Sequence, residues 1–165
     1  MRVGMQREQW VVLVFEIDGH RYAIDSEAVL EIVRAVQPTR LPKAPPVVFG
    51  LIDARGELLP LIDLRLRFGH VRTPIRAHEA FVLVQAKSRR LALRVDRASE
   101  LARVPRSALG AHGEALPQSE LVVGAARLPD GLLVIVDIEA FLDHAEQEAL
   151  EQALRAHRAS EELAT

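Results

Sequence analysis

Short apolar runs rich in β-branched residues alternate with turn-forming residues along most of the chain. The first run covers residues 10–17, and a second follows at residues 20–24. Asp18-Gly19 lies between them, and an Asp-Gly pair flanked by apolar runs is typical of a two-residue hairpin turn. The pattern therefore predicts a β-hairpin near the start of the chain, with a buried first strand.

A second hairpin is predicted in the segment GLIDARGELLPLIDLR, residues 50–65. Two apolar runs are separated there by Ala54-Arg55-Gly56, and glycine in a short connection between such runs favours a hairpin. This turn would hold Arg55 out at the tip of the hairpin. An arginine presented on a rigid turn can bind another molecule, so the hairpin is a candidate binding feature.

Three further segments are less regular. Residues 26–33 fit either a short helix or another strand, with Asp25 or Ser26 as the N-cap of the helix. Residues 38–46 contain four prolines and are expected to form an ordered loop. Residues 70–78 are polar and mixed, and they are the best linker candidate.

The second half of the chain repeats the plan of the first half. Val12-Leu13-Val14 recurs as Val82-Leu83-Val84, and residues 50–63 have the same length and order of features as residues 124–137. Internal repetition of many short strands indicates two similar small β-barrels or sandwiches packed together.

The end of the chain has a helical pattern. Residues 144–164 are rich in Ala, Glu, Gln and Leu, and an apolar stripe contains Ala149, Leu150, Ala153 and Leu154. Two interpretations remain open for this helix. It packs on its own domain, or it presents Leu150 and Leu154 to a partner protein.

The composition is that of a globular protein and excludes several classes of site. The 165 residues are 49% hydrophobic and 27% charged, with a formal net charge of −2 and no cysteine. Disulfides, thiolate metal sites and cysteine nucleophiles are therefore excluded, and no global basic field favours nucleic acid. Residues 1–9 lack the apolar core of a signal peptide, and the longest apolar runs are too short to span a bilayer. We expect a soluble, cytoplasmic protein.

Catalytic machinery is not evident. The six histidines have no zinc-site spacing, and the chain has neither a Gly-x-Ser-x-Gly elbow nor a phosphate-binding glycine loop. Asp63 and Asp137 end strands at equivalent positions of the repeat. They are the one candidate acid–base pair, although repetition favours a structural role such as turn capping. We expect no enzyme activity, no catalytic residues, no metal and no cofactor.

The order of motifs along the chain resembles the CheW-like domain of bacterial chemotaxis. Each motif alone is weak, but their order over residues 10–142 is specific. The motifs are Tyr22-Ala-Ile-Asp25, Val29-Leu-Glu-Ile32, Arg40-Leu-Pro-Lys-Ala-Pro-Pro46, Gly50-Leu-Ile-Asp-Ala-Arg-Gly56, Pro60-Leu-Ile-Asp-Leu-Arg65, Leu93-Arg-Val-Asp96, Leu121-Val-Val-Gly124 and Leu132-Leu-Val-Ile-Val-Asp-Ile138.

This resemblance implies a mainly β fold of two five-stranded, SH3-like β-barrel subdomains with a shared core. The subdomains would cover about residues 10–70 and 79–142, followed by a C-terminal α-helix and tail at residues 143–165. It also implies a non-enzymatic adaptor that couples a CheA-type histidine kinase to the cytoplasmic tips of methyl-accepting chemoreceptors. Such an adaptor is cytoplasmic and associates with membrane receptor arrays. The kinase-binding residues stay unknown from the sequence.

The resemblance further implies a receptor-binding groove between the barrels. Its candidate residues come from the second apolar segment and from the arginine turn. They are Val29, Glu31, Ile32, Val33, Asp53, Arg55 and Gly56. Val29, Ile32 and Val33 would form an apolar wall, and we expect Glu31 and Arg55 to pair and orient the turn.

The chain departs from the family pattern at this turn. The usual Asn-Leu before the arginine is Asp53-Ala54 here, and an aspartate can only accept hydrogen bonds. Asp53 would hold Arg55 back or pair with it. The alternative function is therefore a divergent CheW-like scaffold of a non-flagellar chemosensory system, such as twitching or surface sensing. That scaffold would bind only one of the two partners, or another regulator through its C-terminal helix.

Overall fold

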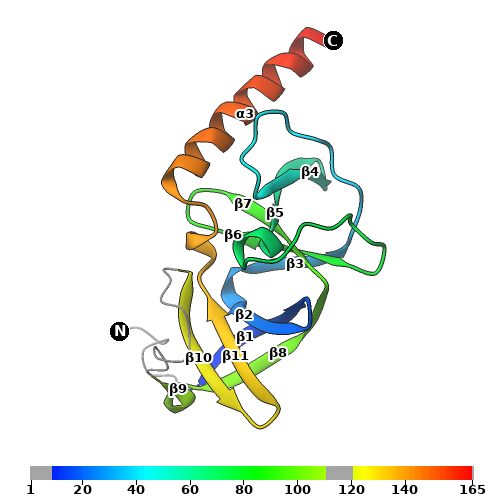
Figure 1. Cartoon of the computed structure of the whole chain (residues 1–165). Helices are drawn as coiled ribbons and strands as arrows, with labels where there is room; N and C mark the ends of the chain where they lie inside the picture. Colours follow the sequence, from blue (N-terminus) through cyan, green and yellow to red (C-terminus); the bar gives the residue numbers. More distant parts are fainter. Residues whose placement is uncertain (1–8, 111–120, 165) are drawn as a thin grey trace.

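Two β-sheets and one long C-terminal helix make up the protein in this computed structural model, which describes residues 9–110 and 121–164 (Figure 1). The predicted fold class is confirmed. The strands are β1 (Gln9–Ile17), β2 (His20–Asp25), β3 (Val29–Arg34), β4 (Val48–Ala54), β5 (Glu57–Asp63), β6 (Ala80–Gln85), β7 (Arg90–Val95), β8 (Arg97–Pro105), β9 (Leu109–Gly110), β10 (Val122–Leu128) and β11 (Gly131–Val136). The helices are α2 (Leu64–Arg67) and α3 (His144–Ala164), and single 3-10 turns lie at Ser26–Ala28, Arg106–Ala108 and Ile138–Ala140.

Each sheet combines strands from both halves of the sequence. The first sheet has the order β8-β1-β2-β11-β10-β9, and the second has the order β3-β6-β7-β5-β4. Neighbouring strands are antiparallel except for β2 with β11 and β5 with β7, which are parallel. Residues 10–70 thus supply β1 and β2 to the first sheet and β3 to β5 to the second. The sequence left open whether end strands cross between the barrels, and in the structure they do.

Two tight turns are built by residues with positive φ. Asp18 and Gly19 have φ of 51° and 78°, and Arg55 and Gly56 have φ of 56° and 87°. Positive φ at both central residues defines the type I′ turn, whose twist matches that of the flanking strands. Both predicted hairpins are therefore present, with two-residue connections.

In the part of the chain that the structure describes, the core consists of three clusters, and β1 contributes to two of them. Val12 and Val14 pack inside the first sheet, whereas Leu13, Phe15 and Ile17 belong to a central core. Because side chains alternate along a strand, an uninterrupted apolar run is required when both faces are buried.

The central core lies between the sheets and receives side chains from both of them and from α3. The second sheet encloses a smaller cluster of its own. The central core includes Phe15, Ile24, Ile62, Val82, Leu93, Val136, Phe141 and Leu150, and the cluster of the second sheet contains Ile52, Leu59, Leu61, Phe81, Leu83 and Ala92.

Residues 26–33 form a single 3-10 turn followed by strand β3, so the strand interpretation holds for most of the segment. The predicted cap is confirmed, because the Asp25 carboxylate accepts a hydrogen bond from the Glu27 backbone N–H at 2.9 Å. The register of β3 against β6 shifts between Val29 and Glu31, which marks a β-bulge at Leu30.

The proline-rich segment 38–46 is ordered by a short backbone bridge. Thr39 and Leu51 exchange backbone hydrogen bonds of 2.8 and 2.7 Å. Gly50 permits this approach, because a Cβ atom at Gly50 would lie 2.5 Å from the Thr39 carbonyl oxygen.

The polar segment 70–78 is held by a buried arginine of β7. Arg94 is 1% exposed and binds Glu79 through Nε at 2.6 Å and Nη2 at 3.0 Å. Its Nη1 donates to the Thr73 carbonyl at 2.7 Å and lies 3.4 Å from Asp63 Oδ2. The segment predicted as a linker is thus fastened to the second sheet.

A second ionic cluster joins the two sheets. Arg65 of α2 forms ion pairs with Asp18, in the β1–β2 turn, and with Asp96, between β7 and β8. Asp96 Oδ2 also accepts the Asp18 backbone N–H at 2.7 Å. The buried guanidinium therefore connects the helix that follows β5 of the second sheet to a turn of the first.

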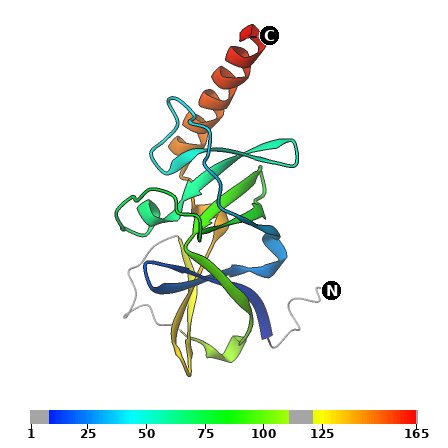
Figure 2. The ribbon, with the colours of Figure 1, turned by 90° about the vertical axis from the view of Figure 1, so that its right-hand side faces the viewer.

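Helix α3 packs on the second sheet and extends away from the first sheet (Figure 2). Leu150, Ala153 and Leu154 are buried in the central core, and Arg89 binds Glu151 at 2.7 Å. The helix thus packs on its own domain. The alternative of a partner surface at Leu150 and Leu154 does not fit, because the core already encloses both side chains. Within the described residues, no helix has the length and apolar character needed to cross a membrane.

Candidate functional site

The arginine turn between β4 and β5 meets strand β3 where the two edges of the second sheet approach each other. Arg55 Nη2 lies 3.0 Å from Glu31 Oε2. β3 and β4 are the two edge strands of this sheet, so the pair joins its opposite edges. The predicted pairing of Glu31 with Arg55 is present. We use the name seam for this place, which consists of Glu31 and its neighbours on β3 together with the turn at Arg55-Gly56.

The geometry of the turn explains why Arg55 reaches Glu31. Asp53 Oδ1 accepts the Gly56 backbone N–H at 2.8 Å, which closes the turn. The carboxylate at position 53 therefore caps the backbone, and the guanidinium of Arg55 extends to β3. Capping the Gly56 N–H requires only a hydrogen-bond acceptor, so aspartate is sufficient at position 53.

The apolar candidates of β3 have different environments. Ile32 is 46% exposed, whereas Val29 packs against the central core and Val33 against the cluster inside the second sheet. Sequence reasoning missed Leu30, which is 48% exposed. Burial alternates along β3 and places Leu30 outside together with Ile32, and the run Val29-Leu30-Glu31-Ile32-Val33 gives no local sign of this.

Exposed apolar residues on an edge strand are unusual in a protein without partners. Leu30 and Ile32 lie on β3, and Val36, just beyond its end, is 53% exposed. Natural proteins normally cover or charge such edges. The seam therefore offers a second protein an apolar strip beside an oriented ion pair.

Asp63 and Asp137 are each the N-cap of the helical turn that follows their strand. Asp63 Oδ1 accepts the Arg65 backbone N–H at 3.2 Å, and Asp137 Oδ1 accepts the Glu139 backbone N–H at 3.0 Å. The structural interpretation of this repeat pair is thus confirmed. In the described part of the chain, no group of three or more His, Asp or Glu side chains is placed to hold a metal ion.

Sequence reasoning also missed the buried charges around Arg94. The available signal was an arginine inside the apolar strand Leu91-Ala-Leu-Arg-Val95. A charge at a buried strand position requires partners, and the segment 70–79 provides them from a distant part of the sequence. Periodicity alone does not identify those partners.

A family model described as the CheW-like domain matches residues 11–146. The chemotaxis protein CheW of Helicobacter pylori is 30% identical over 129 residues, which cover 78% of each chain. The chemotaxis protein CheW of Bacillus subtilis is 29% identical over 135 residues, 80% of this chain and 86% of the relative.

The fold has a counterpart among solved structures. The crystal structure of the scaffolding protein TtCheW from Thermoanaerobacter tengcongensis aligns with a TM-score of 0.76 and 23% identity, covering 84% of this chain and 95% of that one. Over a shorter stretch of 54 residues, a third of each chain, the protein FrzA of Myxococcus xanthus is 44% identical.

Proposed function

Because the chain belongs to the CheW-like domain family, we propose that it is a non-enzymatic adaptor that couples a CheA-type histidine kinase to the cytoplasmic tips of methyl-accepting chemoreceptors. The seam is the observation that carries this proposal. It combines exposed apolar side chains on an edge strand with an arginine oriented by Glu31. Such a surface binds a helix by shape and charge and needs no catalytic group.

A receptor tip would contact the seam through one face of a helix. Helices that lie in apolar grooves present anchors at i, i+3, i+4 and i+7, and Leu30 and Ile32 offer exposed apolar contacts. Val29 and Val33 would support this surface from beneath, since both pack against the core. Arg55 and Glu31 would set the position of the helix, because an exposed ion pair contributes only about 0–1 kcal/mol.

A second function is favoured by the departure at residues 53–54. The turn keeps Arg55 in place but presents Ala54 where the family has leucine, so less apolar surface surrounds the arginine. The alternative is a divergent scaffold of a non-flagellar chemosensory system that binds only one of the two partners, or another regulator through α3. Any contact through α3 would use its exposed face, because Leu150 and Leu154 are buried.

The two functions are separated by a binding experiment with a kinase regulatory domain and a receptor-tip fragment. The adaptor should retain both partners and stimulate the kinase in their presence, whereas retention of one partner alone supports the alternative. Glu31→Arg and Arg55→Glu should each weaken receptor binding, and the double exchange should restore it, because the pair can reform with reversed polarity.

The matched control is Arg127→Glu, which makes the same charge change on β10, far from the seam. It should leave receptor binding unchanged. A double exchange that binds no better than either single variant would refute the orienting role of the pair. Failure of the unmodified chain to bind either partner would refute the proposed function as a whole.

A further inference from the structure

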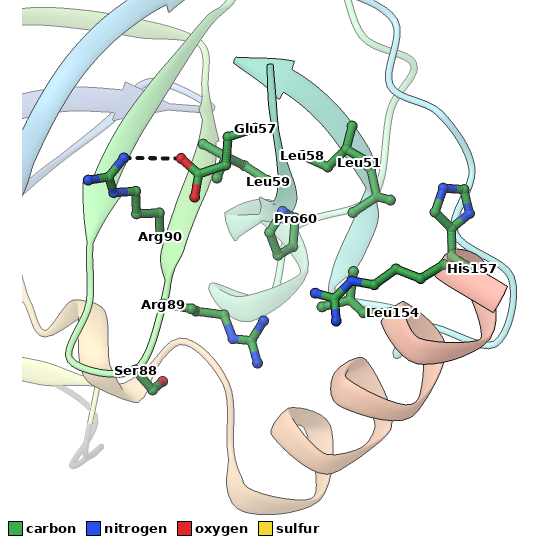
Figure 3. Close-up of a pocket in the computed structure, with 11 residues that line it drawn as sticks. Leu51, Glu57, Leu58, Leu59, Pro60, Ser88, Arg89, Arg90, Leu154 and His157 are labelled. Carbon is green, nitrogen blue, oxygen red and sulfur yellow. Dashed lines mark hydrogen bonds and ion pairs between the residues drawn. The ribbon is translucent and has the colours of Figure 1, made fainter. Parts of the chain in front are cut away.

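Helix α3 forms one wall of a groove whose lining contains neither member of the Glu31–Arg55 pair. The groove has a volume of about 300 Å³ between α3, the start of β5 and the β6–β7 turn (Figure 3). Its lining consists of Leu51, Glu57, Leu58, Leu59, Pro60, Ser88, Arg89, Arg90, Leu154, His157 and Arg158. We call it the α3 groove.

The groove opens because β5 and β7 are not paired over their first residues. The parallel register of β5 with β7 starts at Leu61 and Ala92, so the first residues of both strands lie to either side of an open space. Leu154 and His157 of α3 face this space from the opposite side (Figure 3). The family match ends at residue 146, so the helical wall comes from beyond the matched domain.

The lining is basic. Three arginines line the α3 groove against one carboxylate, Glu57. Arg90 binds Glu57 at 3.0 Å across the entrance (Figure 3), and Arg89 is held toward the helix by Glu151 at 2.7 Å. The pKa of Glu151 is lowered mainly by the hydrogen bond and the charge of Arg89, and further by Arg155 and Arg158. Arg89 and Arg90 therefore each share their charge with a carboxylate, and the lining keeps an excess of arginine over carboxylate.

The groove also offers an apolar contact. Leu58 is 44% exposed beside the buried Pro60 and Leu59. A volume of this size is at the lower end for small-molecule sites and suits one or two side chains. The lining contains no Phe, Tyr or Trp, the platforms on which single-stranded nucleic acid stacks.

We propose that the α3 groove binds a short acidic segment of a partner protein, with one apolar side chain seated on Leu58 and the flanking carboxylates beside Arg89, Arg90 and Arg158. This site goes beyond the proposed adaptor function and does not depend on it. It gives this chain a second docking surface, on the same face of α3 as the buried Leu150 but one to two turns further along the helix.

The test uses a dye-labelled peptide, Gly-Glu-Asp-Leu-Glu-Asp-Gly, whose binding to the whole chain is followed by fluorescence anisotropy. Saturable binding with a Kd below about 1 mM is expected. Arg158→Glu should weaken it at least about tenfold, since like charges then meet in the groove. Arg103→Glu makes the same change on the exposed face of β8 in the first sheet and should alter the Kd by less than about twofold.

Two control peptides complete the experiment. A peptide with alanine in place of leucine should bind more weakly, and one with lysine in place of every acidic residue should not bind. The proposal is overturned by absent binding, by equal losses in both protein variants, or by a lysine peptide that binds as well. Tighter binding of an oligothymidine of similar charge would also overturn it and identify a nucleic-acid site. No kinase or receptor enters this assay, so its failure leaves the adaptor function untouched.

Discussion

At the scale of single residues, buried charges are the feature that most constrains this protein. Arg94 and Glu79 are almost fully buried and joined by two hydrogen bonds of 2.6 and 3.0 Å. A buried charge is tolerated only with such partners, and removing one partner exposes the cost of burying the other. The pair therefore fastens residues 73–79 to β7. An apolar residue at position 94 would make none of these hydrogen bonds, and the loop would lose this attachment.

Acid should weaken this attachment. Burial raises the pKa of Glu79. The hydrogen bonds and charge of Arg94, the Arg76 backbone hydrogen bond and the charge of Arg65 lower it by more, so the net pKa is below the usual value of a glutamate. A carboxyl whose pKa is lower in the folded state stabilises the fold fully above its unfolded pKa and loses that contribution as the pH falls through the folded pKa. The contribution of Glu79 is thus complete above pH 4.5 and declines below it.

Glu79→Gln tests this expectation. The variant should lose about 2–3 kcal/mol of unfolding free energy at pH 7, because Arg94 keeps its position but loses a charged acceptor. Its stability should also fall less steeply than that of the unmodified chain below pH 4.5. Urea unfolding at several pH values measures both effects. Parallel pH curves for the two proteins would show that Glu79 does not contribute to acid sensitivity.

At the scale of elements, α3 is part of the central core. Its inner face buries Leu150, Ala153 and Leu154, while ion pairs from Arg67 and Arg89 hold its first turns. The later turns are exposed and extend beyond the sheet (Figure 2). The helix thus has one half that stabilises the fold and one half that is available for contacts.

Leu150→Ala should lower the free energy of unfolding by about 2–5 kcal/mol, because it removes a fully buried side chain and leaves a cavity. The matched control is Leu163→Ala on the same helix, where the side chain is 89% exposed. That variant should change stability by less than about 0.5 kcal/mol. Chemical denaturation of both proteins gives the comparison, and equal effects would mean that α3 does not form part of the core.

At the scale of the whole molecule, strand exchange makes the two sheets depend on each other. Neither half of the sequence contains a complete sheet, and the central core takes side chains from both sheets. Separate unfolding of one sheet would expose to water the core side chains that the other sheet contributes. We therefore expect one cooperative transition.

Leu93→Ala tests this coupling. Leu93 lies on β7 of the second sheet and is fully buried in the central core, so its truncation should cost about 2–5 kcal/mol. Trp10, the only tryptophan, lies on β1 of the first sheet. Its fluorescence transition should shift by the same amount as the far-UV circular dichroism transition. A Trp10 transition that stays in place would show that the sheets unfold independently.

The candidate site was partly predictable from the sequence. The Asp18-Gly19 and Arg55-Gly56 turns, the Asp25 cap and the apolar strands follow from neighbouring residues, because turn and strand preferences are local. The Glu31–Arg55 pair was predicted from resemblance, since nothing local joins residues 24 positions apart. The exposure of Leu30 was missed because an apolar run does not show which face of a strand is covered, and in the structure burial alternates along β3 and leaves Leu30 and Ile32 outside.

The sequence by itself determined the two hairpin turns and the capping by Asp25, Asp63 and Asp137, but it left residues 26–33 open between helix and strand. Only the tertiary structure decided how the strands are shared between sheets, why the polar segment after α2 is fastened, and which face of α3 is buried. The physical reason is the separation along the sequence between the residues that interact. Turns and caps use hydrogen bonds between neighbours, whereas burial and ion pairing depend on which distant segments meet, and many sequence-compatible pairings exist until the whole core is assembled.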